Sequence, residues 1–245
     1  MILNATILFI AAFLGGISSF LFPDLQKKKF DLLLNFAGAY LFSITIIHIL
    51  PEVYIQYPEP FKIGIFILAG FFLQMVLGSL STGLEHGHLH IHKNHSHSIT
   101  PSVLLIGLGI HSFMEGTILY NPTNISIHDH SGGILLGIVL HKIPAAMALV
   151  AVIYSFIGSK KVAIWYLIIF SLCSPMGLIL ASLVGDFNFF SLTDLAFLYA
   201  VVCGSFLHIS TTIFFESNPQ HNLKYGRLMI IFLGAAVAII IEVFL

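Results

Sequence analysis

The chain has 245 residues, of which 58% are hydrophobic and only 9% are charged, and its mean hydropathy is +0.99. This composition excludes a soluble globular domain and is typical of a polytopic membrane protein. The ten basic residues are scattered and form no stripe, so the net charge of −1 gives no sign of a nucleic-acid partner, and we expect none. Cys173 and Cys203 both lie in apolar runs, so the sequence predicts packing residues there and no disulfide framework.

Apolar runs of about 20 residues, the length that crosses a bilayer, recur along the whole chain. The first run has no basic residues before it, so we expect a retained helix and not a cleaved signal peptide. Pro144 lies inside the fifth run, where we expect a bend. The sequence therefore predicts an all-α membrane protein, with residues 1–245 as one transmembrane domain and eight helices at 2–22, 31–51, 61–81, 101–120, 133–157, 162–184, 193–215 and 226–245.

The connecting segments predict the orientation of these spans, because cytoplasmic loops collect Lys and Arg. Eight of the ten basic residues follow the odd-numbered spans, while Lys62 lies on the opposite side and Lys142 inside a span. We therefore expect both termini outside the cell. The segments "GAYLFSIT" (38–45) and "GSFLHIST" (204–211) are similar and lie in spans that cross in opposite directions, which indicates an inverted repeat, with chance similarity as the alternative.

A histidine-rich segment at 82–100 separates the third and fourth spans, on the predicted cytoplasmic side. Such tracts bind metals through composition and not through fixed geometry. We expect this loop to receive or sense metal without forming a transport site. Its histidines are His86, His88, His90, His92, His95 and His97.

His111 and Glu115 are four residues apart in the span at 101–120, so they share one helix face. The next span carries His141 and Lys142 at a comparable depth. An ionisable group at that depth costs roughly 2.5–3.5 kcal/mol or more, and a lone buried histidine usually bonds a carbonyl or a hydroxyl group. Two imidazoles and a carboxylate together favour a divalent metal site, with zinc as the first choice.

These residues resemble the paired signature of the ZIP (Zrt/Irt-like) metal transporters. The motifs "HSFMEG" (111–116) and "HKIPAA" (141–146) carry the resemblance, and they are closest to the branch with HSxxEG and HK. Weaker matches are "HILPE" (48–52), "SPMG" (174–177) and "GSFLHI" (204–209). The resemblance implies an alternating-access carrier, often dimeric, that imports divalent metal into the cytoplasm between the fourth and fifth helices. His111, Glu115 and His141 match its primary metal site.

The chain departs from the commonest family pattern at three positions. Many members have Asn where Ser112 stands, a carboxylate or Asn where Lys142 stands, and Glu where Ala145 stands. Lys142 places a cation where a second metal would lie, and Ala145 removes the carboxylate that would bridge two ions. We therefore expect one transported metal, zinc before iron. Lys142 is also expected to pair with Glu115 in the metal-free protein.

Further residues are candidates for the transport pathway. His48 and Glu52 end the second span on the predicted outer side, where they could gather cations. His208 and Cys173 are candidates for the exit path, with core packing as the alternative. Ser112 is a candidate auxiliary ligand.

Other functions stay open at this point. The cargo could be Fe²⁺, Mn²⁺ or Cd²⁺ instead of Zn²⁺, and an intramembrane zinc hydrolase would use Glu115 as its base and Ser112 as a helper. A metal sensor would depend on the histidine-rich loop. We expect no catalytic cofactor and no enzyme activity, a homodimer in the plasma membrane, and lipid and metal as the partners.

Overall fold

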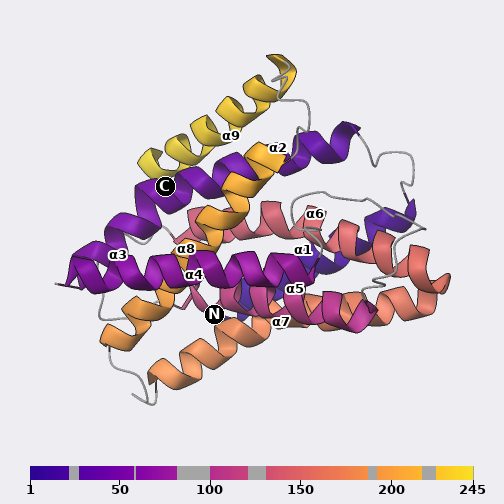
Figure 1. Cartoon of the computed structure of the whole chain (residues 1–245), viewed down its shortest axis with the longest axis horizontal. Helices are drawn as coiled ribbons and strands as arrows, with labels where there is room; N and C mark the ends of the chain where they lie inside the picture. Colours follow the sequence, from indigo (N-terminus) through magenta and orange to yellow (C-terminus); the bar gives the residue numbers. More distant parts are fainter. Residues whose placement is uncertain are drawn as a thin grey trace.

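The computed structural model describes residues 1–21, 28–57, 59–81, 100–120, 131–186, 192–216 and 225–244. Within these ranges the chain is helical and contains no strand, which confirms the predicted all-α class (Figure 1). The helices are α1 (Ile2–Leu21), α2 (Lys28–Ile44), the π-helical turn η2 (Thr45–Ile49), α3 (Leu50–Gln56), α4 (Pro60–Leu80), α5 (Pro101–Thr117), α6 (Ser131–Ile157), α7 (Lys160–Asp186), α8 (Leu192–Glu216) and α9 (Tyr225–Phe244).

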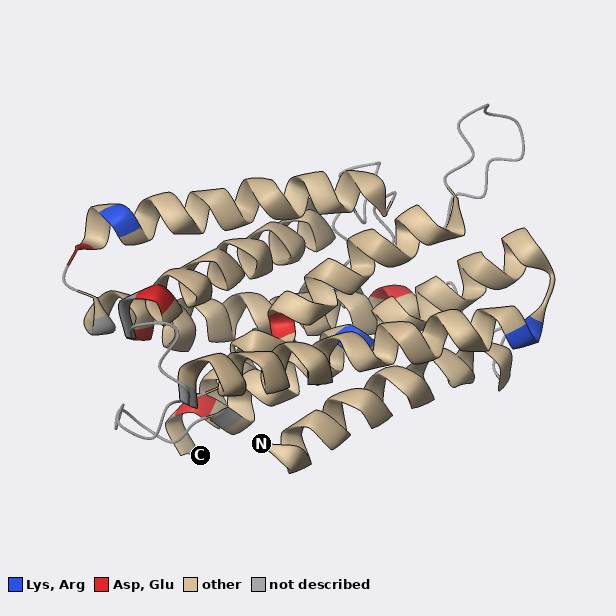
Figure 2. Ribbon diagram, turned by 90° about the horizontal axis from the view of Figure 1, so that it is seen from below, with Lys and Arg blue, Asp and Glu red and all other residues tan. Residues whose placement is uncertain are grey.

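Seven helical segments among the described residues are long and apolar enough to cross a membrane. The helix that falls short is α5, whose 17 residues span about 26 Å at 1.5 Å per residue. Figures 1 and 2 place the two chain ends toward the same end of the bundle, as an even number of crossings requires. We therefore count α5 as the eighth crossing.

The second span is longer than the sequence predicts, because the helix does not end at Pro51. It runs from Lys28 to Gln56 through the π turn, in which the Leu50 N–H donates to the Thr45 carbonyl. Pro51 then lies in the first turn of α3. Because proline has no N–H, one carbonyl of the preceding turn loses its usual helical partner, and the π turn lies directly before this break in the hydrogen-bond pattern.

The helices form two groups that are distinguished by their contacts. The most extensive contacts join α4 with α8, α2 with α9, α1 with α6, and α5 with α7. We call α2, η2, α3, α4, α8 and α9 the α4/α8 group, and α1, α5, α6 and α7 the α5/α6 group. Exchanging α1 with α7, α2 with α8, α4 with α9 and α5 with α6 maps these four contacts onto one another. An inverted repeat produces this pattern, and α2 and α8 carry its two similar segments.

Glycines allow the helices within each group to approach closely. A Cβ added at Gly70 or Gly204, between α4 and α8, or at Gly116 or Gly177, between α5 and α7, would lie 1.9 to 2.0 Å from a carbonyl oxygen of the facing helix. Close backbone approach through small residues is a main source of helix association in membranes. These contacts make α4 with α8, and α5 with α7, firmly packed pairs.

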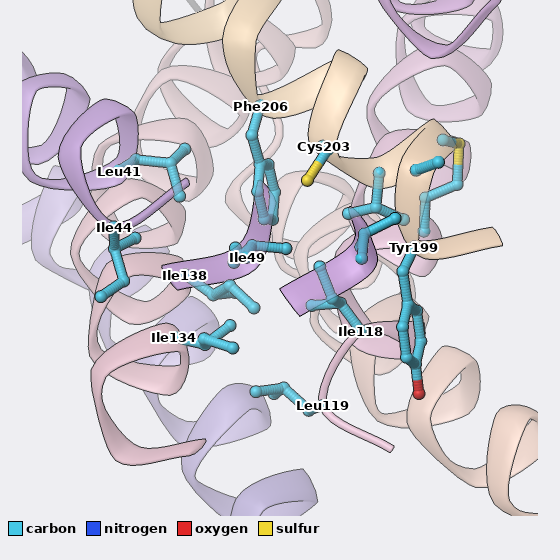
Figure 3. Close-up of a cluster of buried hydrophobic side chains, with 14 of the residues drawn as sticks. Leu41, Ile44, Ile49, Ile118, Leu119, Ile134, Ile138, Tyr199, Cys203 and Phe206 are labelled. Atoms are coloured by element: carbon cyan, nitrogen blue, oxygen red, sulfur yellow. The ribbon is translucent and has the colours of Figure 1, made fainter. Parts of the chain in front are cut away.

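An apolar cluster lies between the two groups, at the end of the bundle where α5 finishes and α6 begins. Figure 3 shows side chains from α2, η2 and α8 facing side chains from α6 and from the turn after α5. Two hydroxyl groups cross between the groups at the same end: Tyr40 Oη donates to the Gly133 carbonyl at 3.0 Å, and Tyr199 Oη donates to the Tyr120 carbonyl. We name it the outer-end cluster after the side that the sequence predicts to be extracellular, and it consists of Leu41, Ile44, Ile49, Ile118, Leu119, Ile134, Ile138, Tyr199, Cys203 and Phe206.

Candidate metal centre

Charged side chains lie mostly near the helix ends, but blue and red segments also appear in the middle of the bundle (Figure 2). His111 and Glu115 on α5 and His141 on α6 are all buried, and each offers a ligand atom within 4.8 Å of the others. His111 Nε2 lies 3.0 Å from Glu115 Oε1, and the two imidazole rings lie edge to face with centroids 5.8 Å apart. Among the described residues, no other set of three such side chains converges in this way.

His141 has the least satisfied side chain of the three. Its ring is 1% exposed, and neither Nδ1 nor Nε2 has a hydrogen-bond partner among the described residues. A buried polar group without a partner costs free energy, most of all in a membrane interior without water. Two imidazoles and a carboxylate are also ligands that a borderline divalent ion such as zinc accepts. The residues present therefore fit a metal ion.

Lys142 lies on the other side of Glu115 and is itself 1% exposed. Its Nζ donates to Glu115 Oε2 at 2.7 Å and to Ser112 Oγ at 2.6 Å, and it lies 5.2 Å from the centre of the Phe170 ring. The two carboxylate oxygens thus have separate neighbours: Oε1 faces His111 and Oε2 binds the ammonium group. The structure contains the pair between Lys142 and Glu115 that the sequence suggested.

Ser112 belongs to the lysine side of the site and not to the three-ligand cluster. Its hydroxyl accepts from Lys142 and lies 3.0 Å from Ser174 Oγ on α7, and the Ser174 hydroxyl also donates to the Ser112 carbonyl. Ala145 is buried in an apolar cluster. Glu115 is therefore the carboxylate that the described part of the centre supplies.

His48 and Glu52, which the sequence suggested as pathway residues, do not belong to the three-ligand cluster, and His48 contacts a further residue, Glu242, that sequence reasoning missed. His48 Nε2 is 3.3 Å from Glu52 Oε2, and His48 Nδ1 is 2.7 Å from Glu242 Oε1 on α9. The π turn places His48 at this position on the helix. The sequence analysis did not predict Glu242, which follows an apolar run, although an acidic residue inside a predicted span could have indicated it.

The remaining candidates do not join the centre. The His208 ring packs edge-on against Phe71 at 4.9 Å, and Cys173 Sγ donates to the Ile169 carbonyl at 3.2 Å, as packing residues would. The loop histidines at 86–97 lie outside the described residues.

Two further polar residues contact the centre and were not expected from the sequence. Gln74 on α4 accepts a hydrogen bond from His111, with Oε1 and Nδ1 3.1 Å apart, and Ser205 on α8 donates to the same amide oxygen at 2.8 Å. Both side chains are buried. The sequence feature that could have indicated Gln74 was a single amide within an otherwise apolar stretch of its span.

Comparison with known proteins agrees with this arrangement. A family model described as the ZIP zinc transporter matches residues 80–242, which is about two thirds of the chain and includes α5 to α8 and most of α9. The chain belongs to the ZIP family. This ZIP-family protein is therefore a multi-pass membrane protein, and the resemblance seen in the motifs at His111 and His141 is confirmed.

One curated relative is Protein zntD of Dictyostelium discoideum, which is 29% identical over 174 residues. The match covers 64% of this chain and 25% of zntD. The ZIP-family chain thus corresponds to about a quarter of the length of that relative.

Proposed function

We propose that this ZIP-family protein carries divalent metal, with zinc preferred, into the cytoplasm through His111, Glu115 and His141. The observation that supports this most strongly is His141, whose two buried ring nitrogens lack partners beside a second imidazole and a carboxylate. A ligand ion would satisfy all three side chains together. Iron, manganese and cadmium are the alternative cargoes, because imidazole and carboxylate ligands also bind these ions.

The site is proposed to hold one ion and to release it readily. Three protein ligands leave a coordination position open, whereas structural zinc sites are closed by four ligands. Lys142 Nζ lies 2.7 Å from Glu115 Oε2, the oxygen that a second ion would need to bind. We propose that the arriving metal weakens this ion pair, so that Lys142 acts as an internal counter-ion in the metal-free protein.

Alternating access is proposed to come from sliding of the α5/α6 group against the α4/α8 group. All three candidate ligands lie on α5 and α6, so they would move as one unit. The outer-end cluster fills the space between the groups on one side of the centre and would exclude a hydrated ion. His48, Glu52 and Glu242 carry charge near that end, where they could concentrate cations.

Transport is favoured over zinc-dependent hydrolysis because Ser112 bonds Lys142 and Ser174 and does not face the three ligands. The remaining parts of the proposal are a plasma-membrane location with extracellular termini, a homodimer as the family resemblance implies, and transport driven by the metal gradient or membrane potential.

Uptake of radioactive zinc into cells tests this function. Glu115→Ala and His141→Ala should abolish uptake at unchanged surface expression, while Ser155→Ala should not, because that hydroxyl on α6 bonds only the Val152 carbonyl of its own helix at 2.8 Å. Iron, manganese and cadmium added as competitors would rank the cargo metals. Full uptake by both ligand variants would contradict the proposal.

A further inference from the structure

We propose that Gln74, held in place by Ser205, is a positioning residue that fixes the tautomer and orientation of His111 for metal binding. Gln74 contacts the imidazole of His111, so its effect is exerted through that ring. The inference rests on the proposed function only for the identity of the ligand. The hydrogen bonds on which it depends exist without metal.

The position of Gln74 on α4 argues for a specific task. Residues 63–77 of α4 are otherwise entirely apolar, and the Gln74 side chain is fully buried at 0% exposure. An amide in the membrane interior is unfavourable unless it is hydrogen-bonded, so an apolar residue would be the simpler choice there. The partners that Gln74 finds are His111 and Ser205, which lie on two other helices.

The geometry determines which ring nitrogen carries the proton. Gln74 Oε1 can only accept, so His111 Nδ1 must be the donor across the 3.1 Å contact. Ser205 uses its proton on the same amide oxygen at 2.8 Å, so toward Nδ1, 3.5 Å away, its oxygen can also only accept. Both contacts place the proton on Nδ1. The lone pair is then on Nε2, the nitrogen that lies 3.0 Å from Glu115 Oε1.

The two histidines of the centre therefore differ in how firmly their rings are oriented before metal binds. His111 is oriented by neighbours on α4 and α8, as metal-binding histidines commonly are through their second ring nitrogen. His141 has no such hydrogen bond from the described residues and is held by packing alone. We infer that His111 and Glu115 form the preorganised half of the site and that the metal itself orders His141.

The contact also joins the two helix groups. Gln74 and Ser205 belong to the α4/α8 group, where close glycine contacts fix the spacing of the helices, while His111 belongs to the α5/α6 group. Sliding of one group against the other would separate Gln74 from His111. The orientation of the metal-binding nitrogen, and with it the affinity of the site, would then depend on the position of the groups.

Two measurements on the purified full chain in lipid nanodiscs test this inference. The first is ¹⁵N NMR of the histidine rings without metal, with His111 assigned from the signal that is absent in His111→Asn. We expect the Nδ1–H tautomer in wild type and in Gln74→Glu, which keeps an acceptor oxygen, and a mixture of tautomers in Gln74→Leu.

The second measurement is the affinity for Zn²⁺ and Co²⁺ by titration. Gln74→Leu should bind about 10- to 100-fold more weakly, Gln74→Glu should recover most of the loss, and Ser205→Ala should show a smaller decrease. Ser79→Ala is the matched control, since this exposed hydroxyl on α4 bonds only the Val76 carbonyl of its own helix. Thermal unfolding of each variant shows whether it is folded.

The outcomes separate this inference from the proposed function. An unchanged His111 tautomer in Gln74→Leu would overturn the inference, and so would unchanged metal affinity in that variant. If Gln74→Leu does not fold, the same comparison is made with Ser205→Ala against Gln74→Glu. If His141→Ala binds metal as tightly as wild type, the proposed metal site is refuted. The NMR measurement would still decide the role of Gln74.

Discussion

Replacing Lys142 with methionine tests the internal counter-ion of the metal centre. Methionine keeps most of the length and apolar contacts of the lysine stem but removes its charge. In the metal-free protein, Glu115 would then be a buried carboxylate that has lost the ammonium group 2.7 Å from Oε2. Both side chains of this pair are no more than 2% exposed, so water cannot replace the missing charge.

The expected changes have opposite signs with and without metal. Removing one partner of a buried ion pair costs about 3–5 kcal/mol of stability. A divalent ion about 5 Å from an ammonium group is repelled by about 7 kcal/mol at an effective dielectric constant of about 20. Even a fifth of that repulsion corresponds to about a tenfold change in affinity. Lys142→Met should therefore be less stable without metal and should bind zinc at least about tenfold more tightly.

Thermal unfolding in nanodiscs, with and without zinc, measures both effects. The variant should melt below wild type without metal and gain more from zinc, because ligand stabilisation grows with affinity. The double variant Glu115→Gln with Lys142→Met should recover metal-free stability, since no lone charge remains. Lys62→Met is the control, because that lysine pairs with Glu59 at an exposed helix end. Wild-type stability in metal-free Lys142→Met, or weaker zinc binding by it, would refute the counter-ion role.

Three further predictions concern the centre, the packing and the outer end. His141→Ala should weaken zinc binding in a titration and should lower metal-free melting only through the lost packing of the buried ring, because its ring nitrogens have no hydrogen bond to lose. Gly116→Ala would place a methyl group 2.0 Å from the Ser174 carbonyl oxygen and should lower stability in thermal unfolding by about 1–3 kcal/mol, whereas Gly132→Ala meets open space and should be neutral. Glu242→Gln should raise the KM for zinc uptake without changing the zinc affinity of the purified protein; an equal change in both would place Glu242 in the binding site.

The sequence predicted the helices well because each apolar run must satisfy its own backbone within the membrane. It erred at Pro51, where hydropathy and a proline together suggested a helix end. The π turn before that residue lets the helix continue to Gln56. Such a change of hydrogen-bond register depends on packing, and no local residue pattern specifies it.

The pairing of His111 with Glu115 was also predictable, since residues four apart on a helix are neighbours. His141 was predicted from its comparable depth on the next span, and the structure places it beside them. Gln74 and Glu242 were missed, because a single polar residue in an apolar span does not indicate which distant residue it contacts. Their partners, His111 and His48, lie on other helices.

The amino-acid sequence by itself determined that this protein is a helical membrane protein with a histidine and a carboxylate on one buried face. These properties follow from local hydropathy and from helical periodicity. Only the tertiary structure decided that Lys142 takes one oxygen of Glu115, that Gln74 orients His111, and that the helices divide into two groups. Each of these depends on how different helices pack against one another, which periodicity along one helix does not contain.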